Sequence, residues 1–156
     1  MPQNRKFQNF VENKFMADDA VGAAELVDDA VGNAALGASQ PKNVKFTYDF
    51  SSDGGAVSSI TLGTLPDKAV VVRGTVEVET AVTSAGSATV AFGLVANTDA
   101  FVGATAKTSL GLNAAIASSN DLPLKMAGDT DVLATIATAA LTAGKIHLHV
   151  VYYEGA

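Results

Sequence analysis

The chain has 156 residues, of which 48% are hydrophobic and 17% charged, and this balance predicts one globular domain with room for an arm. Its net charge of −6 argues against nucleic acid and anionic membranes as main partners, because both attract clustered Lys and Arg. The lack of cysteine excludes disulfides, thiolate metal sites and cysteine nucleophiles. The chain has no Trp and 6% aromatic residues, so its core must use many small side chains, and burial in an oligomer would help to stabilise it.

The N-terminus carries Arg5 and Lys6, but no apolar segment follows them, so we expect no secretory signal. No run approaches the roughly 20 apolar residues that a membrane-spanning helix needs. Together with the lack of cysteine, these features fit a protein made in a reducing cytosol.

Residues 1–40 are predicted to form an extended, partly helical N-terminal arm. Within residues 5–16, the apolar side chains recur at the i, i+3, i+4, i+8 spacing of one helical stripe. An isolated amphipathic helix this short is marginal in water, so we expect the stripe to dock on the protein's own domain or on a neighbouring subunit or partner. The stripe consists of Phe7, Phe10, Val11 and Phe15.

A ten-residue repeat follows in residues 18–37, DDAVGAAELV and DDAVGNAALG. The Asp pairs are good N-caps, so each unit is predicted to be a short capped helical segment, although Gly22 and Gly32 weaken any continuous helix. Ten residues cannot bury an apolar face alone, and two copies are too few for a solenoid, so we expect the same segment of other chains to pack alongside. An Ala-rich linker is the alternative. The predicted trimer-contact side chains are Val21, Leu26, Val31 and Leu36.

Residues 41–156 are predicted to form a mainly β domain, an antiparallel β-sandwich of the jelly-roll or a related kind. In residues 44–50 the side chains alternate, with Val44, Phe46, Tyr48 and Phe50 on one face. Residues 51–55 read as a turn, and residues 100–126 show no clear pattern apart from a short strand at 122–126. The other predicted strands are 57–62, 69–80, 87–95, 130–139 and 144–153.

His147 and His149 lie two residues apart on the last predicted strand, so they share a face. Two histidines on one face are half of a metal site. No third ligand can be assigned, and we favour the interpretation that both are surface residues on an outward face. The opposite face of this strand is predicted to be buried and carries Ile146, Leu148, Val150 and Tyr152.

The remaining candidate sites have simpler explanations. Glu77 and Glu79 alternate along a strand as a solvated stripe, or meet Lys or Arg across a subunit boundary. Asp53-Gly54-Gly55 and Asp129-Thr130-Asp131 offer oxygen ligands for calcium, but turn chemistry explains both better. Neither G-x-S-x-G nor a Gly-rich phosphate loop is present. We therefore predict no catalytic residue, no cofactor and no metal, and a protein that is not an enzyme.

Several motifs carry a resemblance to small virion proteins of tailed bacteriophages. They are F-T-Y-D-F at 46–50, L-P-D-K-A-V-V at 65–71, T-S-A-G-S-A-T-V at 83–90 and A-L-T-A-G-K at 140–145. The D-D-A-V-G-x-A-x-L repeat is similar to short repeats near the shafts and collars of trimeric phage fibres. The resemblance implies a β-rich capsid decoration (cement) protein, a head fibre or a tail component, and it implies no catalytic residues.

From these features we predict a capsid decoration protein that stabilises the shell as a homotrimer. Its partners would be its own copies and the major capsid protein, on the surface of a virion assembled in the host bacterial cytoplasm. The first alternative is a head- or tail-fibre or adaptor protein with a receptor- or glycan-binding sandwich, for which Tyr152 and Tyr153 are the aromatic residues near an expected edge. The second alternative is a metal hydrolase that uses His147 and His149.

Overall fold

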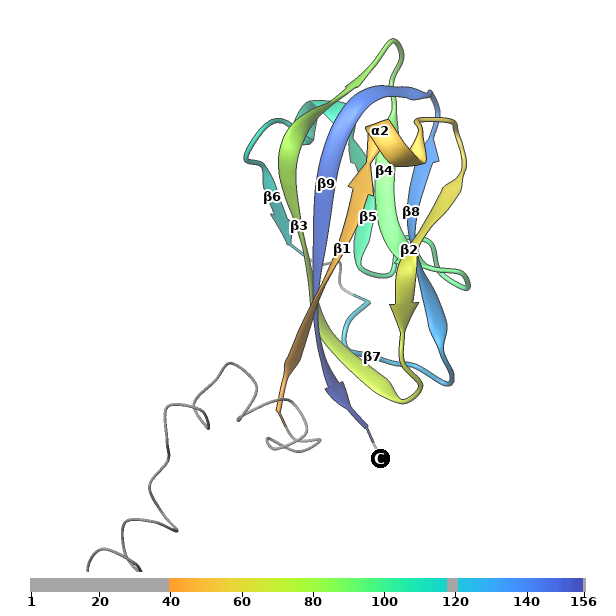
Figure 1. Cartoon of the computed structure of the whole chain (residues 1–156), viewed down its shortest axis with the longest axis vertical. Coiled ribbons are helices and arrows are strands. Elements are labelled where there is room, and N and C mark those ends of the chain that lie inside the picture. Colours follow the sequence, from red (N-terminus) through yellow and green to blue (C-terminus); the bar gives the residue numbers. More distant parts are fainter. Residues whose placement is uncertain (1–39, 118–120, 156) are drawn as a thin grey trace, which may run out of the picture. The chain divides into compact units, whose positions relative to one another are not determined.

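The structure, a computed structural model, describes residues 40–117 and 121–155. These residues form two antiparallel sheets that lie face to face, as in a β-sandwich (Figure 1). Apart from Gln40, the predicted arm with its helix and repeat lies outside the described residues. In the described part of the chain, no helix is long and apolar enough to span a bilayer.

The first sheet, sheet A, has the strand order β1-β9-β3-β6, and the short strand β7 also pairs with β3. The long strands β3 and β9 pair side by side, with several register shifts of the kind that bend and twist strands. The strands of sheet A are β1 (Lys42–Asp49), β3 (Ala69–Ser84), β6 (Ala115–Ala117), β7 (Leu124–Lys125) and β9 (Leu141–Glu154).

The second sheet, sheet B, has the strand order β2-β8-β4-β5. A short helix joins β1 to β2, and a 3₁₀ turn follows β5. The strands are β2 (Ser59–Leu65), β4 (Thr89–Leu94), β5 (Val102–Ala106) and β8 (Thr130–Ala137), and the helical segments are α2 (Phe50–Asp53) and η1 (Lys107–Ser109).

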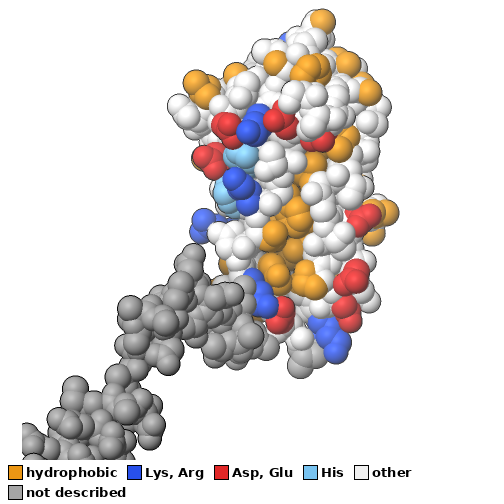
Figure 2. All heavy atoms as spheres, in the orientation of Figure 1, with side chains coloured by type: hydrophobic (Ala, Val, Ile, Leu, Met, Phe, Trp, Pro, Cys, Tyr) orange, Lys and Arg blue, Asp and Glu red, His pale blue; other side chains and the backbone are white. Residues whose placement is uncertain are grey.

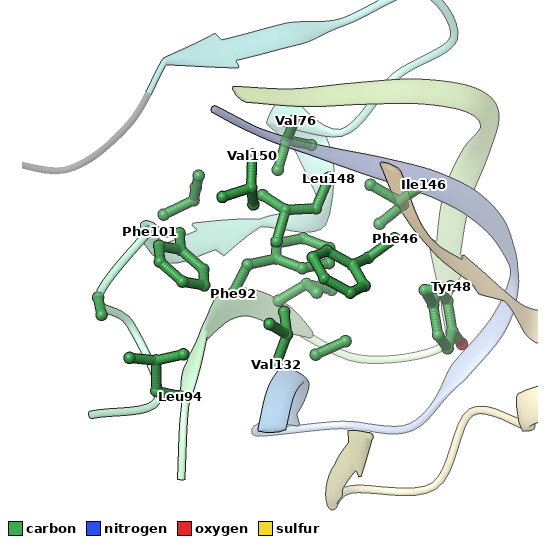
Figure 3. Close-up of a cluster of buried hydrophobic side chains, with 14 of the residues drawn as sticks. Phe46, Tyr48, Val76, Phe92, Leu94, Phe101, Val132, Ile146, Leu148 and Val150 are labelled. Atoms are coloured by element: carbon green, nitrogen blue, oxygen red, sulfur yellow. The ribbon is translucent and has the colours of Figure 1, made fainter. Parts of the chain in front are cut away.

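The core lies between the two sheets because each strand turns alternate residues inward. The predicted buried face of β9 is confirmed for Ile146, Leu148 and Val150, each 0% exposed, and Tyr152 is partly buried. Figure 3 shows the cluster in which these side chains meet aromatic residues from other strands and loops. The aromatic members of the core are Phe46, Tyr48, Phe92 and Phe101.

The helix α2 corrects the prediction for the end of the first strand. We expected Phe50 to continue the strand, but it begins α2 and is only partly buried against the core. The strand ends at Asp49 because the Asp49 carboxylate accepts hydrogen bonds from the Ser51 backbone N–H and hydroxyl, which caps the helix. Tyr48, one residue earlier, donates its hydroxyl proton to the Gly54 carbonyl at 2.7 Å, and burial with the nearby Asp53 and Asp49 carboxylates raises its pKa to about 12.

The other predicted strands coincide with observed strands, with shifted ends. Residues 57–62, 69–80, 87–95, 130–139 and 144–153 overlap β2, β3, β4, β8 and β9. The prediction missed β5 and β6, which lie in the segment without a clear pattern. Both are short and bordered by small residues, so their pairing with β4 and β3 rather than local alternation determines them.

Gly93 in β4 lets the following loop fold back onto sheet B. The Leu94 N–H donates to the Asn97 carbonyl at 2.7 Å, and the Asn97 N–H donates to the Leu94 carbonyl at 3.1 Å. A Cβ at position 93 would overlap backbone atoms of Asn97, Thr98 and Asp99. The loop can therefore close only over a glycine.

We predict that Gly93→Ala lowers the free energy of unfolding by about 2 kcal/mol, because the added methyl group must push the backbone of the loop away. The matched control is Gly103→Ala in β5 of the same sheet, where an added Cβ meets nothing within 4 Å. We expect the control to change stability by less than about 1 kcal/mol. Urea unfolding monitored by circular dichroism measures both, and equal effects of the two substitutions would contradict this role of Gly93.

Candidate functional site

Polar side chains from three strands meet on the outer face of sheet A. The register places His147 of β9 between Thr47 of β1 and Glu77 of β3. His149 lies next along the same face of β9, between Lys45 and Thr75. The prediction that the two histidines share a face is confirmed, and the strands on either side supply their neighbours.

His147 is 7% exposed, so the expectation that it is a surface residue is wrong. Its Nδ1 atom lies 2.9 Å from Thr47 Oγ1, and its Nε2 atom lies 2.6 Å from Glu79 Oε2. In the neutral ring one nitrogen donates and the other accepts, and the Thr47 hydroxyl can take either complementary role. The ring is buried because it lies on a central strand, with the hydrogen-bonded side chains of Thr47 and Glu79 on either side.

Glu79 is shared between two basic side chains of β9, those of Lys145 and His147. Its Oε1 atom accepts a hydrogen bond from Lys145 Nζ at 3.1 Å, while Oε2 faces His147. The hydrogen bonds from His147 and then from Lys145 lower the pKa of the Glu79 carboxyl below its ordinary value of 4.5. Glu77 makes the neighbouring pair, with its Oε2 atom 2.9 Å from His149 Nε2. The two glutamates do form an exposed stripe, and they are bonded to Lys and His side chains of the same chain.

This network ties β1, β9 and β3 together across their outer face. The two imidazole rings stand edge to face with centroids 6.4 Å apart. Both ring nitrogens of His147 are engaged, so a metal ion would have to displace Thr47 or Glu79. No group of three or more potential metal ligands occurs among the described residues. His147 and Glu79 form their hydrogen bonds within the network. We therefore interpret the network as one that stabilises the pairing of β1, β9 and β3.

The other candidate carboxylates also form hydrogen bonds within the chain. Asp53 accepts hydrogen bonds from the Asp49 backbone and the Ser52 hydroxyl. Asp129 accepts from the Asp67 backbone N–H at 2.9 Å. These bonds are those expected of carboxylates that stabilise helix starts and turns. Asp131 differs from the turn expectation, because it lies in β8 and accepts from the Thr64 hydroxyl of β2 at 3.0 Å.

The outer face of sheet B has a different character. One row across it contains Ser59, Thr135 and Ala91, and the hydroxyls of Ser59 and Thr135 are hydrogen bonded at 2.9 Å. The next row contains Ala137, Thr89 and Ala106. In Figure 2, His, Lys and Glu side chains gather on one side of the visible face, and a stripe of apolar side chains runs beside them.

Of the remaining predicted site residues, the structure describes the two tyrosines of β9. Tyr152 and Tyr153 are adjacent on β9, which lies between β1 and β3, so they point to opposite faces at the end of a central strand and form no joint platform. The predicted anchors and trimer-contact residues lie outside the described residues. Thr47 was not predicted as a partner of His147, and the only sequence signal for it is the position of Thr47 in the alternating strand 44–50.

Chains from solved bacteriophage capsids share this fold. One is from the cyanophage Pam1 capsid asymmetric unit, with a TM-score of 0.60 and 22% identity over 73% of this chain and 84% of that one. Another is from the acidic stable capsid of Helicobacter pylori bacteriophage KHP30, with a TM-score of 0.57 and 18% identity over 74% of this chain and 88% of that one. A third is from the capsid of Ralstonia phage GP4, with a TM-score of 0.60 and 19% identity over 76% of this chain and 86% of that one.

No protein-family model and no curated protein matches the chain. At 18–22% identity, the likeness to the three solved chains concerns the fold. Since the alignments cover 84–88% of those chains, the shared fold makes up most of each of them.

We predict that Glu79→Gln weakens the stabilisation that the network provides above about pH 4.5. A carboxyl group whose pKa is lower in the folded than in the unfolded chain stabilises the fold above its unfolded pKa, and this contribution is lost as the pH falls through the folded pKa. The stability difference between wild type and Glu79→Gln should therefore shrink as the pH falls below the ordinary carboxyl pKa of 4.5 and through the lowered pKa of Glu79. Urea midpoints measured across this range give the difference.

The matched control is Asp99→Asn, which neutralises an exposed carboxylate for which no side-chain hydrogen bond or ion pair is found among the described residues. We expect it to change the pH profile less than Glu79→Gln does. A stability difference for Glu79→Gln that stays constant down to acid pH would rule out the carboxylate as its cause.

Proposed function

We propose that this protein is a structural protein of a tailed-bacteriophage virion that decorates the capsid and cements its shell as a homotrimer. The observation that carries the proposal is the shared fold, which extends over 73–76% of this chain and most of three chains from phage capsid structures. The virion-protein motifs in residues 45–94 and 140–152 support the same assignment independently. The protein would act on the capsid surface, with the major capsid protein as its partner.

We also infer that the sandwich is a jelly roll. The strand orders β1-β9-β3-β6 and β2-β8-β4-β5 place the first strand beside the last and alternate distant strands across each sheet. This order supports an eight-strand arrangement of two sheets built from Greek keys, with β7 as an addition to the edge of β3. Such a body is rigid because its sheets are joined through one continuous core.

The proposed mechanism is stabilisation by mass action. A protein that binds the assembled shell but not its loosened forms favours the assembled shell, in proportion to the logarithm of its concentration relative to the Kd. A rigid sandwich supplies a fixed body at each site, and an arm that reaches a neighbour adds contact area. In this proposal Phe7, Phe10, Val11 and Phe15 anchor the arm on the shell, and the repeat joins the trimer.

We predict that replacing Phe7, Phe10 and Phe15 together with Ser reduces binding to undecorated shells by at least about 100-fold, since three buried aromatic anchors are lost. The matched control replaces Asn9, Glu12 and Asn13 with Ser, because these residues lie in the same segment and outside the apolar stripe. Co-sedimentation of purified protein with shells measures both. Undiminished binding of the Phe variant would overturn the anchor assignment.

We predict that the full chain is a trimer in solution and that deletion of residues 1–40 yields a monomer. The reason is that Val21, Leu26, Val31 and Leu36 would then be absent, so the contacts proposed between copies are lost. Light scattering coupled to size-exclusion chromatography gives both masses. A monomeric full chain, or a trimer that persists after the deletion, would refute the role of the repeat.

A further inference from the structure

A shallow groove lies beside the histidine–glutamate network on the outer face of sheet A. It has a volume of about 440 Å³ and adjoins a second hollow of about 350 Å³, with which it shares Arg73, Thr75 and Ala115. The first volume lies within the usual range for small-molecule sites. Strand β3 forms its floor, and His149 of β9 and Asn113 of the loop before β6 line it.

The groove lies where β6 carries alanine side chains beside β3. The register pairs Thr75 with Ala117 and Glu77 with Ala115. An alanine methyl group fills little of the space above the sheet next to a glutamate or an arginine. The result is a hollow with polar groups along it and an apolar wall formed by Ala115 and Val151.

Arg73 gives the groove a cation that can bind an anion. Its Nε atom donates to Thr75 Oγ1 at 3.3 Å, a long bond, and among the described residues it makes no ion pair. The carboxylate of Glu77 is instead held by His149 at 2.9 Å. An exposed guanidinium in this state presents a fork of N–H donors that matches a carboxylate in a bidentate arrangement.

The groove also offers groups that recognise hydroxyls. Asn43 and Asn113 line it with side-chain amides, which donate and accept at once, and Thr75 and Glu77 add oxygen atoms. Asn113 is held in place because its backbone N–H donates to the Val78 carbonyl at 3.0 Å. Its φ of 62° is a conformation that Asn adopts more readily than most residues.

Part of the groove floor has no free main-chain edge for a peptide strand. Residues 75–77 of β3 pair with β9 on one side and with β6 on the other. An extended peptide therefore cannot pair with residues 75–77 of β3, and a ligand above them must be recognised by side chains. A ligand with one carboxylate, several hydroxyls and a small apolar face fits these groups.

We propose that this groove binds a uronic acid unit, a sugar ring that carries hydroxyls and one carboxylate. Arg73 pairs with the carboxylate, Asn43 and Asn113 bond to ring hydroxyls, and the C–H face of the ring lies against Val151 and Ala115. This site is separate from the proposed docking of the arm on a capsid. It would allow the sandwich to bind acidic polysaccharide whether or not the protein cements a shell.

The test is a titration of the full-length, ¹⁵N-labelled protein with sodium glucuronate and galacturonate, followed by NMR. We expect one of the two uronates to bind with a Kd of about 1 mM and to shift the amide signals of Val151 and Ala115. The neutral sugars glucose and galactose should bind at least about tenfold more weakly, and so should acetate, which offers the carboxylate without hydroxyls. An oligosaccharide of the preferred uronate then tests recognition within a polymer.

Variants locate the site. Arg73→Gln should weaken uronate binding at least about tenfold, and Arg73→Lys should also weaken it because the bidentate fork is lost. The control Lys125→Gln removes an exposed cation outside the groove and should leave binding unchanged. Unchanged circular dichroism spectra show that each variant is folded. No binding of either uronate at about 20 mM, equal binding of acetate or of a neutral sugar, or binding that survives Arg73→Gln would each overturn the proposal.

Discussion

The antiparallel pairing of β3 with β9 is the interaction on which the rest of the structure depends. These strands have 16 and 14 residues and pair from Ala69 opposite Glu154 to Ser84 opposite Leu141. Their inward side chains supply the centre of the core, and their outward side chains supply Glu79 and His147. A slip of one residue would turn the apolar face of β9 to water and separate the network, so core packing and the surface network specify the same register.

The two outer faces of the sandwich show how one backbone pattern can carry different surfaces. On sheet A, charged and histidine side chains form hydrogen bonds with one another across three strands. Both ring nitrogens of the buried His147 therefore have a hydrogen-bond partner. The groove beside the network differs because Arg73 is left outside these ion pairs. On sheet B, small and hydroxylated residues cover the same kind of surface, and a loop folds over Gly93. The histidine–glutamate network stabilises the pairing of β1, β9 and β3. The groove contains side chains that are available to a ligand.

The low identity to the capsid chains has a physical explanation. A sandwich core requires apolar residues at inward positions and glycine at a few close approaches, and many sequences meet these requirements. Outward positions are freer to change, so proteins with this fold can differ in what their faces bind. The fold therefore supports a structural role in a virion, while the chemistry of this chain's own side chains must carry any statement about a ligand.

The sequence alone determined the local features of this protein. Period-two alternation located β1, because a strand with one buried face leaves this pattern, and runs of strand-forming residues between turn residues located β2, β3, β4, β8 and β9. The alternation of side chains along a strand also placed His147 and His149 on one face. Only the tertiary structure decided that β5 and β6 are strands, since their small residues gain their conformation by pairing with neighbours. It likewise decided that His147 is buried, because Thr47 and Glu79, which enclose it, lie 100 and 68 residues away in the chain and reach it only through the register of the sheet.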